Sequence, residues 1–299
     1  MYIHSYSIIV KYGGIKYMNI AIIGLGNIGG SFALSIKENI PDANIYAIDI
    51  DTAVIQKAKD QHIIKDGSDD FKNIIPHADL IIFAVYPKLL VQLVRDYSPH
   101  LKEGCIITDV TGVKTSIIDE VEPLLPEHAD FVFGHPMAGR ENRGLEFSSR
   151  EVFIGANYLI TPTPRNKEEN IEFLKNFVKK LEFGSISVIT PDFHDEVIGF
   201  TSQLAHVIAI SLINSDDAER NTKKFTGDSY RDLTRITNIN EKLWPELFMM
   251  NKDHLVKHIE NFQTQLDKLN AAIQSDDVET MEEMMIESTK RYKDLHDIE

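Results

Sequence analysis

Three glycines and one aspartate near the start of the chain have the types and the spacing that bind a dinucleotide. The glycine motif 24–29, Gly-Leu-Gly-Asn-Ile-Gly, follows an apolar run and opens a helical pattern, and Asp49 ends the next apolar run, twenty residues after Gly29. In such a motif the glycines allow a tight turn, leave room for a pyrophosphate and let helix pack on strand, while N–H groups at the helix start attract phosphates. Asp49 would bind a ribose diol and repel a 2′-phosphate, which predicts an NAD site.

The predicted cofactor-binding residues follow from this motif. They are Gly24, Leu25, Gly26, Asn27, Ile28, Gly29 and Asp49. Asp51 competes with Asp49 for the ribose contact, but the apolar pattern places Asp49 at the strand end. A glycine turn in an unrelated α/β domain is the alternative. The preceding strand, the following helix and the distance to the acid together favour the dinucleotide site.

Two polar loops follow later apolar runs, where the reactive groups of α/β proteins collect. One is 109–114, Asp-Val-Thr-Gly-Val-Lys, and the other is 134–144, directly after residues 131–133. The second loop puts His135 near the expected place of a nicotinamide, where a neutral imidazole can accept a hydroxyl proton as hydride leaves the neighbouring carbon. The alternative is a histidine that only bonds a backbone carbonyl. We favour the catalytic interpretation because loops at this edge often carry function.

Alternating strands and helices must position these groups. From residue 18 to about 190, strands are expected at 80–85, 105–109, 131–133, 157–161 and 185–189, and helices at 51–60, 87–97, 114–122 and 167–181. Such alternation indicates a doubly wound parallel sheet. After residue 190 the strand patterns stop. We therefore predict an α/β protein with an N-terminal Rossmann-type domain over 18–190 and an all-α C-terminal domain over 191–299.

The C-terminal domain is expected to form a homodimer. Residues 193–213 are apolar almost all round, and residues 255–273 repeat apolar positions at alternating four-three spacing. A last helix at about 276–295 is expected to turn Met281 and Met285 inward. A domain this small cannot cover a helix that is apolar on every side, so a second copy of the chain is the expected cover.

Composition excludes several function classes. The formal net charge of −15 over 299 residues argues against a nucleic-acid partner, and the single Cys105 excludes a disulfide framework and a cysteine-rich zinc site. No apolar run is expected to reach the length of a membrane span. Residues 1–17 lack the basic start and the cleavage site of a signal peptide, so a cytoplasmic location is expected. We interpret them as an extension upstream of the first strand, of the kind a mis-set start codon would add.

A metal site is not predicted. Asp192, His194 and Asp195 lie close together in the sequence and include ligand types. They are more typical of a polar helix start, where acids interact favourably with the helix dipole.

Four motifs occur in one order along the chain and carry a resemblance to a known family. After the glycine motif come His135-Pro-Met-Ala-Gly with Glu141, the segment 202–206 (Ser-Gln-Leu-Ala-His), and the segment 231–236 (Arg-Asp-Leu-Thr-Arg-Ile) followed by Trp244. Together they resemble the prephenate dehydrogenase family of tyrosine biosynthesis, which includes arogenate dehydrogenases, over residues 18 to about 275. The resemblance implies a nucleotide domain, a helical dimerisation domain and NAD-dependent oxidative decarboxylation of prephenate to 4-hydroxyphenylpyruvate and CO₂.

The resemblance also implies roles for single residues. His135 matches the catalytic histidine that hydrogen-bonds the ring hydroxyl, and Arg235 matches the arginine that binds a substrate carboxylate, a task that suits a guanidinium. His206 is implied to contact the substrate, and Trp244 to supply an aromatic ring near the site. Glu141 and Asp232 are implied to form an acidic pair near the pocket entrance, with Arg231 beside them.

Plainer interpretations of these residues stay open. Arg231 and Arg235 are four residues apart and could form a surface pair on one helix face, with Asp232 as an intrahelical partner. Trp244 could pack in the core. His206 could be a buried histidine bonded to the backbone.

The chain departs from the family pattern at three motif positions. Gly112 replaces the serine of the usual Asp-x-Gly-Ser-x-Lys loop, whose hydroxyl helps to orient histidine and substrate. We expect Thr111 to supply a hydroxyl instead and count it as a catalytic candidate. Gln203 and Ala205 replace a histidine and a proline of the helix motif.

Three other functions compete with prephenate oxidation. The first is arogenate dehydrogenase, which we rank second because no acid is clearly committed to the ammonium group of arogenate. The second is a 3-hydroxyacid dehydrogenase, which would need a lysine that residues 193–213 do not contain. The third, from another class, is a non-catalytic dimer that senses NAD.

Overall fold

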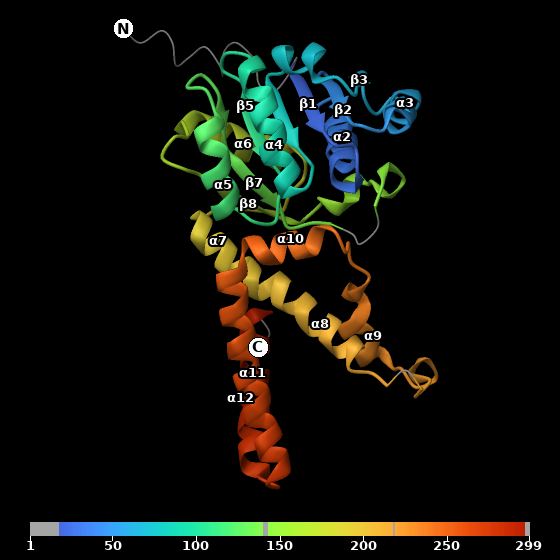
Figure 1. Cartoon of the computed structure of the whole chain (residues 1–299), viewed down its shortest axis with the longest axis vertical. Coiled ribbons are helices and arrows are strands. Elements are labelled where there is room, and N and C mark those ends of the chain that lie inside the picture. The colour runs from blue at the N-terminus through green and yellow to red at the C-terminus, as the bar shows by residue number, and fades with distance from the viewer. Residues whose placement is uncertain (1–17, 140–142, 218, 297–299) are drawn as a thin grey trace.

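The structure is a computed structural model that describes residues 18–139, 143–217 and 219–296 (Figure 1). Its first part contains a six-stranded parallel sheet in the order β3-β2-β1-β4-β5-β6. The strands are β1 (Asn19–Ile23), β2 (Asn44–Ile48), β3 (Asp66–Ser68), β4 (Leu80–Phe83), β5 (Ile106–Asp109) and β6 (Asp130–Phe131). This order is that of a dinucleotide-binding sheet, so the predicted Rossmann-type fold is confirmed.

Alternation along β1 explains how helices cover both faces of this sheet. Ile20 and Ile22 belong to one apolar core, and Ala21 and Ile23 belong to the other. The first core is completed by α2 (Asn27–Asn39) and α6 (Glu168–Lys180), and the second by α4 (Pro87–Tyr97) and α5 (Thr115–Val121). The helix α3 (Thr52–Asp60) follows β2 at the sheet edge.

A second sheet corrects the expectation of one continuous sheet. Strand β7 (Phe133–Pro136) pairs antiparallel with β8 (Asn157–Thr161), which pairs parallel with β9 (Ser185–Val188). The predicted strand 131–133 is in fact divided, because the chain leaves the first sheet after β6 and begins β7 one residue later. Val132 between them is buried in the first core, so the two sheets share that core.

As predicted, the described residues after 190 contain no strand, and short 3₁₀ turns and loops join the main helices. These helices are α7 (Pro191–Ile198), the π-helical segment Gly199–Leu204, α8 (Ala205–Asn214), α9 (Asp228–Thr234), α10 (Leu243–Met250), α11 (Lys252–Gln274) and α12 (Val278–Leu295). Figure 1 shows α10 directly beneath the sheets, while α8 and the pair α11 and α12 extend away from them. Thr190 caps α7 by accepting a hydrogen bond from the Phe193 N–H, and Pro191 stands in the first turn.

Much apolar surface of these helices is exposed in the single chain. The most apolar 18-residue window of the continuous helix Pro191–Asn214 has a mean hydropathy of 1.5, and only 28% of that window is buried. By length and composition it could cross a membrane, which corrects the expectation that no segment is long enough. Phe200 is 60% exposed, and Met285 on α12 is also 60% exposed rather than inward as predicted, because α12 packs mainly on α11.

Candidate active site

The loop between β1 and α2 leaves room for phosphates. Gly24 has a φ of +91°, and a Cβ there would lie 2.7 Å from the backbone oxygen of Ala84. A Cβ at Gly29 would lie 1.9 Å from the Gly24 oxygen, so both positions require glycine. A Cβ at Gly26 would meet nothing within 4 Å, and no side chain caps the N-terminus of α2 there. Open space therefore lies at a helix N-terminus, where a pyrophosphate fits.

Asp49 lies at the end of β2 beside this loop. Its Oδ2 accepts a hydrogen bond of 2.7 Å from the Leu25 N–H, and its Oδ1 accepts one of 2.9 Å from the Asp51 N–H. Asp51 has a different task, because its carboxylate caps α3 by accepting from the N–H groups of Ala53 and Val54. The structure thus leaves Asp49 as the candidate for the ribose contact.

The other residues of the motif place the loop against the protein. Leu25 and Asn27 are buried, so their side chains pack against the protein. Ile28 is half-buried, and a Cβ at Gly139 would lie 3.9 Å from its Cδ1. The segment that carries His135 therefore passes beside the first turn of α2.

His135 is the first member of a chain of three side chains. It lies on β7, and its Nδ1 is 2.9 Å from Nε2 of His194 on α7. Nδ1 of His194 is in turn 2.8 Å from Oδ1 of Asp195. The carboxylate of Asp195 also accepts hydrogen bonds of 2.8 Å from the N–H groups of Lys114 and Thr115 at the start of α5.

A buried ion pair fixes the loop beneath His135. Lys114 and Asp109 are fully buried, with Nζ of Lys114 2.6 Å from Oδ2 of Asp109. The same Nζ donates hydrogen bonds to the carbonyl oxygens of Thr111 and Gly134, and Oδ1 of Asp109 accepts one from the Gly134 N–H. The pair thus joins loop 109–114 to the residue before His135. Burial lowers the pKa of Lys114, although the Asp109 carboxylate opposes this.

Thr111 does not replace the family serine in this geometry, which corrects our expectation. Its hydroxyl donates to Asp109, lies 3.1 Å from the carbonyl oxygen of Val113 and accepts from Lys114, so it is bonded within the buried ion pair. A Cβ at Gly112, by contrast, would lie 3.7 Å from Cε1 and Nε2 of His135. Position 112 is therefore the one from which a side chain would reach the histidine.

The environment keeps both histidines neutral. Burial holds the pKa of His135 well below its usual range, and His194 and Lys114 lower it further. Burial also lowers the pKa of His194, although the hydrogen bond to Asp195 opposes the shift. Burial raises the pKa of Asp195, but the hydrogen bonds from His194 and Thr115 outweigh it and keep the carboxylate ionised.

The free energy of unfolding is expected to decrease as the pH falls below about 6.5. The folded-state pKa values of His135 and His194 lie below the ordinary 6.5, so the unfolded chain binds more protons in acid. Stability is therefore complete above the unfolded pKa and is lost below it. Denaturant unfolding over a pH series measures the slope. If the unfolding free energy of the double variant His135→Asn, His194→Gln falls with pH as steeply as that of the wild type, the two histidines are not the cause of the pH dependence.

The rings of His206 and Trp244 pack against each other at an interplanar angle of 31°. Their ring centroids are 3.6 Å apart, and Nδ1 of His206 lies 2.9 Å from the Ser202 carbonyl oxygen. Trp244 lies on α10, and Leu247 of the same helix would be 3.8 Å from a Cβ at Gly112. The helix α10 therefore connects this aromatic pair to the surroundings of His135.

Gln203, which replaces a histidine of the family motif, has a structural role. Its Oε1 accepts a hydrogen bond of 2.9 Å from Nδ2 of Asn251, which also donates to the carbonyl oxygen of Asp195. Its Nε2 lies 3.4 Å from the carbonyl oxygen of Leu247. These bonds tie α7, α10 and α11 together behind the histidine pair.

The charged residues predicted on α9 lie apart from His135. Arg231 pairs with Asp228 and donates to the Thr226 carbonyl, so it is engaged at the surface, but with Asp228 rather than with the Asp232 considered as its partner. Asp232 is exposed, and Arg235 is exposed on the 3₁₀ turn Arg235–Thr237. Figure 1 shows α9 beside α8, away from the sheets. The single chain does not bring these residues to the histidine.

Glu141 lies outside the described residues. Nearby, Arg143 makes a 2.8 Å ion pair with Glu241, which links the loop after β7 to the helical part. The motifs did not include either residue. The three residues considered as metal ligands have separate partners, since Asp192 contacts His254 at 3.2 Å while His194 and Asp195 belong to the histidine chain. Among the described residues, no cluster of three or more His, Cys, Asp or Glu could hold a metal.

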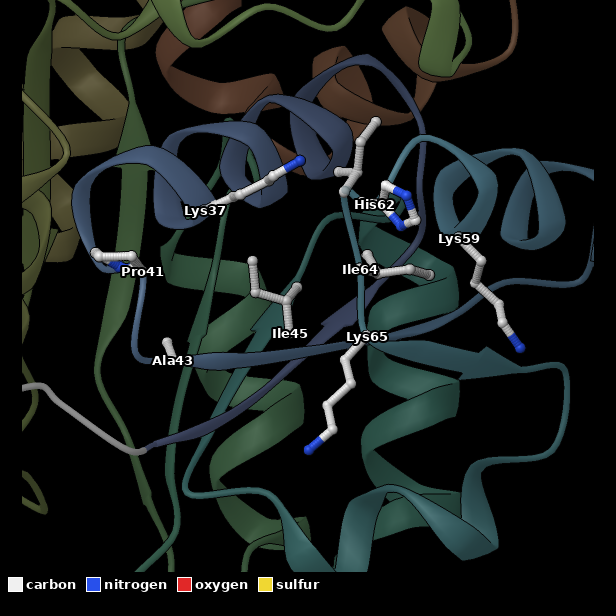
Figure 2. Close-up of a pocket in the computed structure, with 9 residues that line it drawn as sticks. Lys37, Pro41, Ala43, Ile45, Lys59, His62, Ile64 and Lys65 are labelled. Atoms are coloured by element: carbon white, nitrogen blue, oxygen red, sulfur yellow. The ribbon is translucent and has the colours of Figure 1, made fainter.

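A cavity lies away from this site (Figure 2). Its volume is about 460 Å³, and it is lined by Lys37, Pro41, Ala43, Ile45, Lys59, His62, Ile63, Ile64 and Lys65. Lys59 pairs with Asp66 and Lys65 with Asn44, and Figure 2 shows their ammonium groups pointing in different directions. The cavity opens at the amino ends of the strands, opposite the glycine loop, and none of its residues belongs to the predicted site.

Known proteins resemble the chain along most of its length. The family model for the nucleotide-binding domain of prephenate dehydrogenase matches residues 32–186, and the model for its dimerization domain matches residues 190–287. The prephenate dehydrogenase of Bacillus subtilis is 30% identical over 88% of this chain and 72% of its own length. The cyclohexadienyl dehydrogenase of Zymomonas mobilis is 31% identical over 94% of this chain and 98% of its own.

A solved structure agrees with these relatives. It is the prephenate dehydrogenase of Aquifex aeolicus in complex with hydroxyphenyl propionate and NAD⁺, which superposes with a TM-score of 0.85 at 28% identity. The match covers 93% of this chain and 98% of that one. The glycine motif 24–29 precedes the range of the nucleotide-binding model, so its assignment depends on the loop geometry above.

Proposed function

The chain belongs to the prephenate dehydrogenase family, and within this family of NAD-dependent oxidoreductases we propose that it oxidises prephenate in preference to arogenate. The observation that carries the oxidation itself is the chain of hydrogen bonds behind His135, since it leaves the lone pair of Nε2 of this histidine for a reacting hydroxyl. Prephenate would then lose CO₂ and two electrons to give 4-hydroxyphenylpyruvate.

The residues divide the task as follows. The open N-terminus of α2 at Gly26 would hold the pyrophosphate, and Asp49 would hold the adenosine ribose. When NAD⁺ is bound it supplies the hydride acceptor. Nε2 of His135 accepts the proton of the substrate hydroxyl, and the O–H electron pair forms the carbonyl as hydride leaves the same carbon. Loss of the ring carboxylate as CO₂ then makes the ring aromatic, and the phenolate oxygen that this loss creates takes the proton back from Nε2 of His135.

The substrate contacts are proposed from the family resemblance. Arg235 would bind a carboxylate, and the packed rings of His206 and Trp244 would face the substrate ring. A keto side chain suits this surface because the acids that flank Trp244 are engaged elsewhere. Glu241 pairs with Arg143, and Glu246 accepts from the Lys88 N–H.

An NADH absorbance assay with prephenate and arogenate, each with NAD and NADP, tests the proposal. Prephenate with NAD is expected to give the largest kcat/KM. A larger kcat/KM with arogenate would identify an arogenate dehydrogenase. Cofactor binding without NADH formation from either substrate would favour the non-catalytic NAD-sensing dimer.

Cofactor preference should depend on Asp49. Changing Asp49→Ser is expected to raise kcat/KM with NADP by about tenfold or more, because a shielded like-charge contact costs several kcal/mol. Asp51→Ser is the matched control, since Asp51 caps α3 and should leave the preference unchanged. Equal use of NAD and NADP by the native enzyme would contradict the assignment of Asp49.

We propose a homodimer formed by the helices after residue 190. The exposed apolar side chains of Pro191–Asn214 and the match of residues 190–287 to a dimerization domain support it. Sedimentation at micromolar concentration is expected to give a dimer, and Phe200→Asp is expected to shift it toward monomer. Ile154→Asp, at an exposed apolar position of the α/β part, is the control. The cytoplasmic location and the absence of nucleic-acid and membrane partners stay predictions.

A further inference from the structure

The chain of hydrogen bonds that runs from Asp195 through His194 to His135 determines which nitrogen of each imidazole carries a proton. The Asp195 carboxylate accepts two backbone N–H bonds from the start of α5, so it is held as an ionised acceptor facing His194. An ionised carboxylate has only lone pairs to offer, and therefore Nδ1 of His194 must carry the proton at that contact. Nε2 of a neutral His194 is then an acceptor.

The same reasoning extends to the next ring. Because Nε2 of His194 accepts, Nδ1 of His135 must donate across the 2.9 Å contact. A neutral imidazole carries one proton, so Nε2 of His135 is left with its lone pair. In the opposite tautomer Nε2 would hold a proton and could not accept one from a hydroxyl.

We propose that His194 and Asp195 are positioning residues for the oxidation: they fix the proton of His135 on Nδ1 and keep Nε2 as the proton acceptor. The inference rests on the proposed function, in which His135 takes the hydroxyl proton. When Nε2 gains that proton, the Nδ1–H of the His135 imidazolium stays bonded to His194, and the Asp195 carboxylate stabilises the positive charge through it.

The other groups around the pair are compatible with this arrangement. Lys114 and Asp109 face the histidines from the start of α5 and the end of β5, and their opposite charges meet in one ion pair. From α10 the neighbour is the apolar Leu247, and from α11 it is the neutral Asn251. Asp195 is therefore the anion in direct contact with the pair.

Variants of His194 separate positioning from mere packing. A glutamine amide can donate to Asp195 with its nitrogen and accept from His135 with its oxygen, whereas phenylalanine fills the space without either bond. His194→Phe is expected to lower kcat by about 100-fold with KM within about threefold, and His194→Gln to retain kcat within about tenfold. Asp195→Asn is expected to lower kcat and to move the acid limb of kcat/KM to lower pH, because the charge that favours His135 protonation is lost.

The control is a second His–Asp contact of the same helix. His254→Phe removes the contact of His254 with Asp192 between α11 and α7 and should leave kcat and the pH profile unchanged. His194→Phe and His194→Gln could instead lose kcat equally, bind NAD more weakly and have a lower Tm, with no change of the pH profile. That result would show that His194 only packs. Unchanged kcat in His194→Phe would overturn the proposal outright.

The native enzyme offers a test that needs no variant of the pair. ¹⁵N NMR of the wild-type enzyme with NAD, at a pH where His135 is neutral, is expected to show a protonated Nδ1 and an unprotonated Nε2 on His135. A protonated Nε2 would overturn the proposal even if prephenate oxidation is confirmed. An enzyme that oxidises neither prephenate nor arogenate would instead remove the proposed function, and the NMR result would still report the tautomer.

Discussion

His135→Asn is expected to lower kcat by about 10²- to 10⁴-fold, which is the usual contribution of one general base. The asparagine retains a polar group of smaller size on β7, but it cannot accept a proton at the position of Nε2. KM for prephenate and the affinity for NAD should change by only about a few-fold, because proton transfer matters chiefly in the transition state.

Steady-state kinetics with NADH detection checks this expectation. Asn251→Ser, which alters a hydrogen bond behind the pair without touching His135, shows how much activity a nearby packing change removes. Turnover of His135→Asn at the wild-type level would remove His135 from the mechanism. A rise in KM with unchanged kcat would mean that the histidine only binds substrate.

Lys114→Met is expected to cost about 3–5 kcal/mol of unfolding free energy, because it leaves the buried Asp109 carboxylate without its cation. It also removes the bonds from Nζ to the carbonyl oxygens of Thr111 and Gly134, so activity should fall together with stability. Denaturant unfolding measures the first effect and NADH formation the second.

An exposed pair supplies the matched control. Lys59→Met breaks the contact of Lys59 with Asp66 at the surface, and such pairs contribute about 0–1 kcal/mol. A loss of similar size in both variants would show that burial does not set the importance of the Lys114–Asp109 pair. A stable Lys114→Met enzyme with normal activity would contradict the role given to that pair.

The first half of the fold was accessible from local pattern. The apolar runs, the glycine motif and the acid at the end of β2 depend on neighbours in the sequence, and they were enough to predict a Rossmann-type sheet. The break between β6 and β7 was not visible, because Phe131, Val132 and Phe133 form one unbroken apolar run. Only pairing with β5 on one side and β8 on the other divides it.

The candidate site shows the same limit. His135 stood in a motif, but its partner His194 is 59 residues away in the sequence. The segment that contains His194, with Asp192 and Asp195, had only the pattern of a polar helix start. No pattern within α7 tells which side chain turns toward β7. Likewise, the direction of the Thr111 hydroxyl depends on the buried Lys114, whose partners come from both loops.

The placement of His135 on β7 and of His194 on α7 has a consequence for biosynthesis on the ribosome. The amino-terminal residues emerge first and fold as a unit, so a nascent chain could already retain nucleotide at the glycine loop. Its catalytic base would acquire a defined tautomer only after α7 has been translated and has docked against β7. Nucleotide capture would thus precede chemical competence, and an unfinished chain would not consume the precursor of an aromatic amino acid.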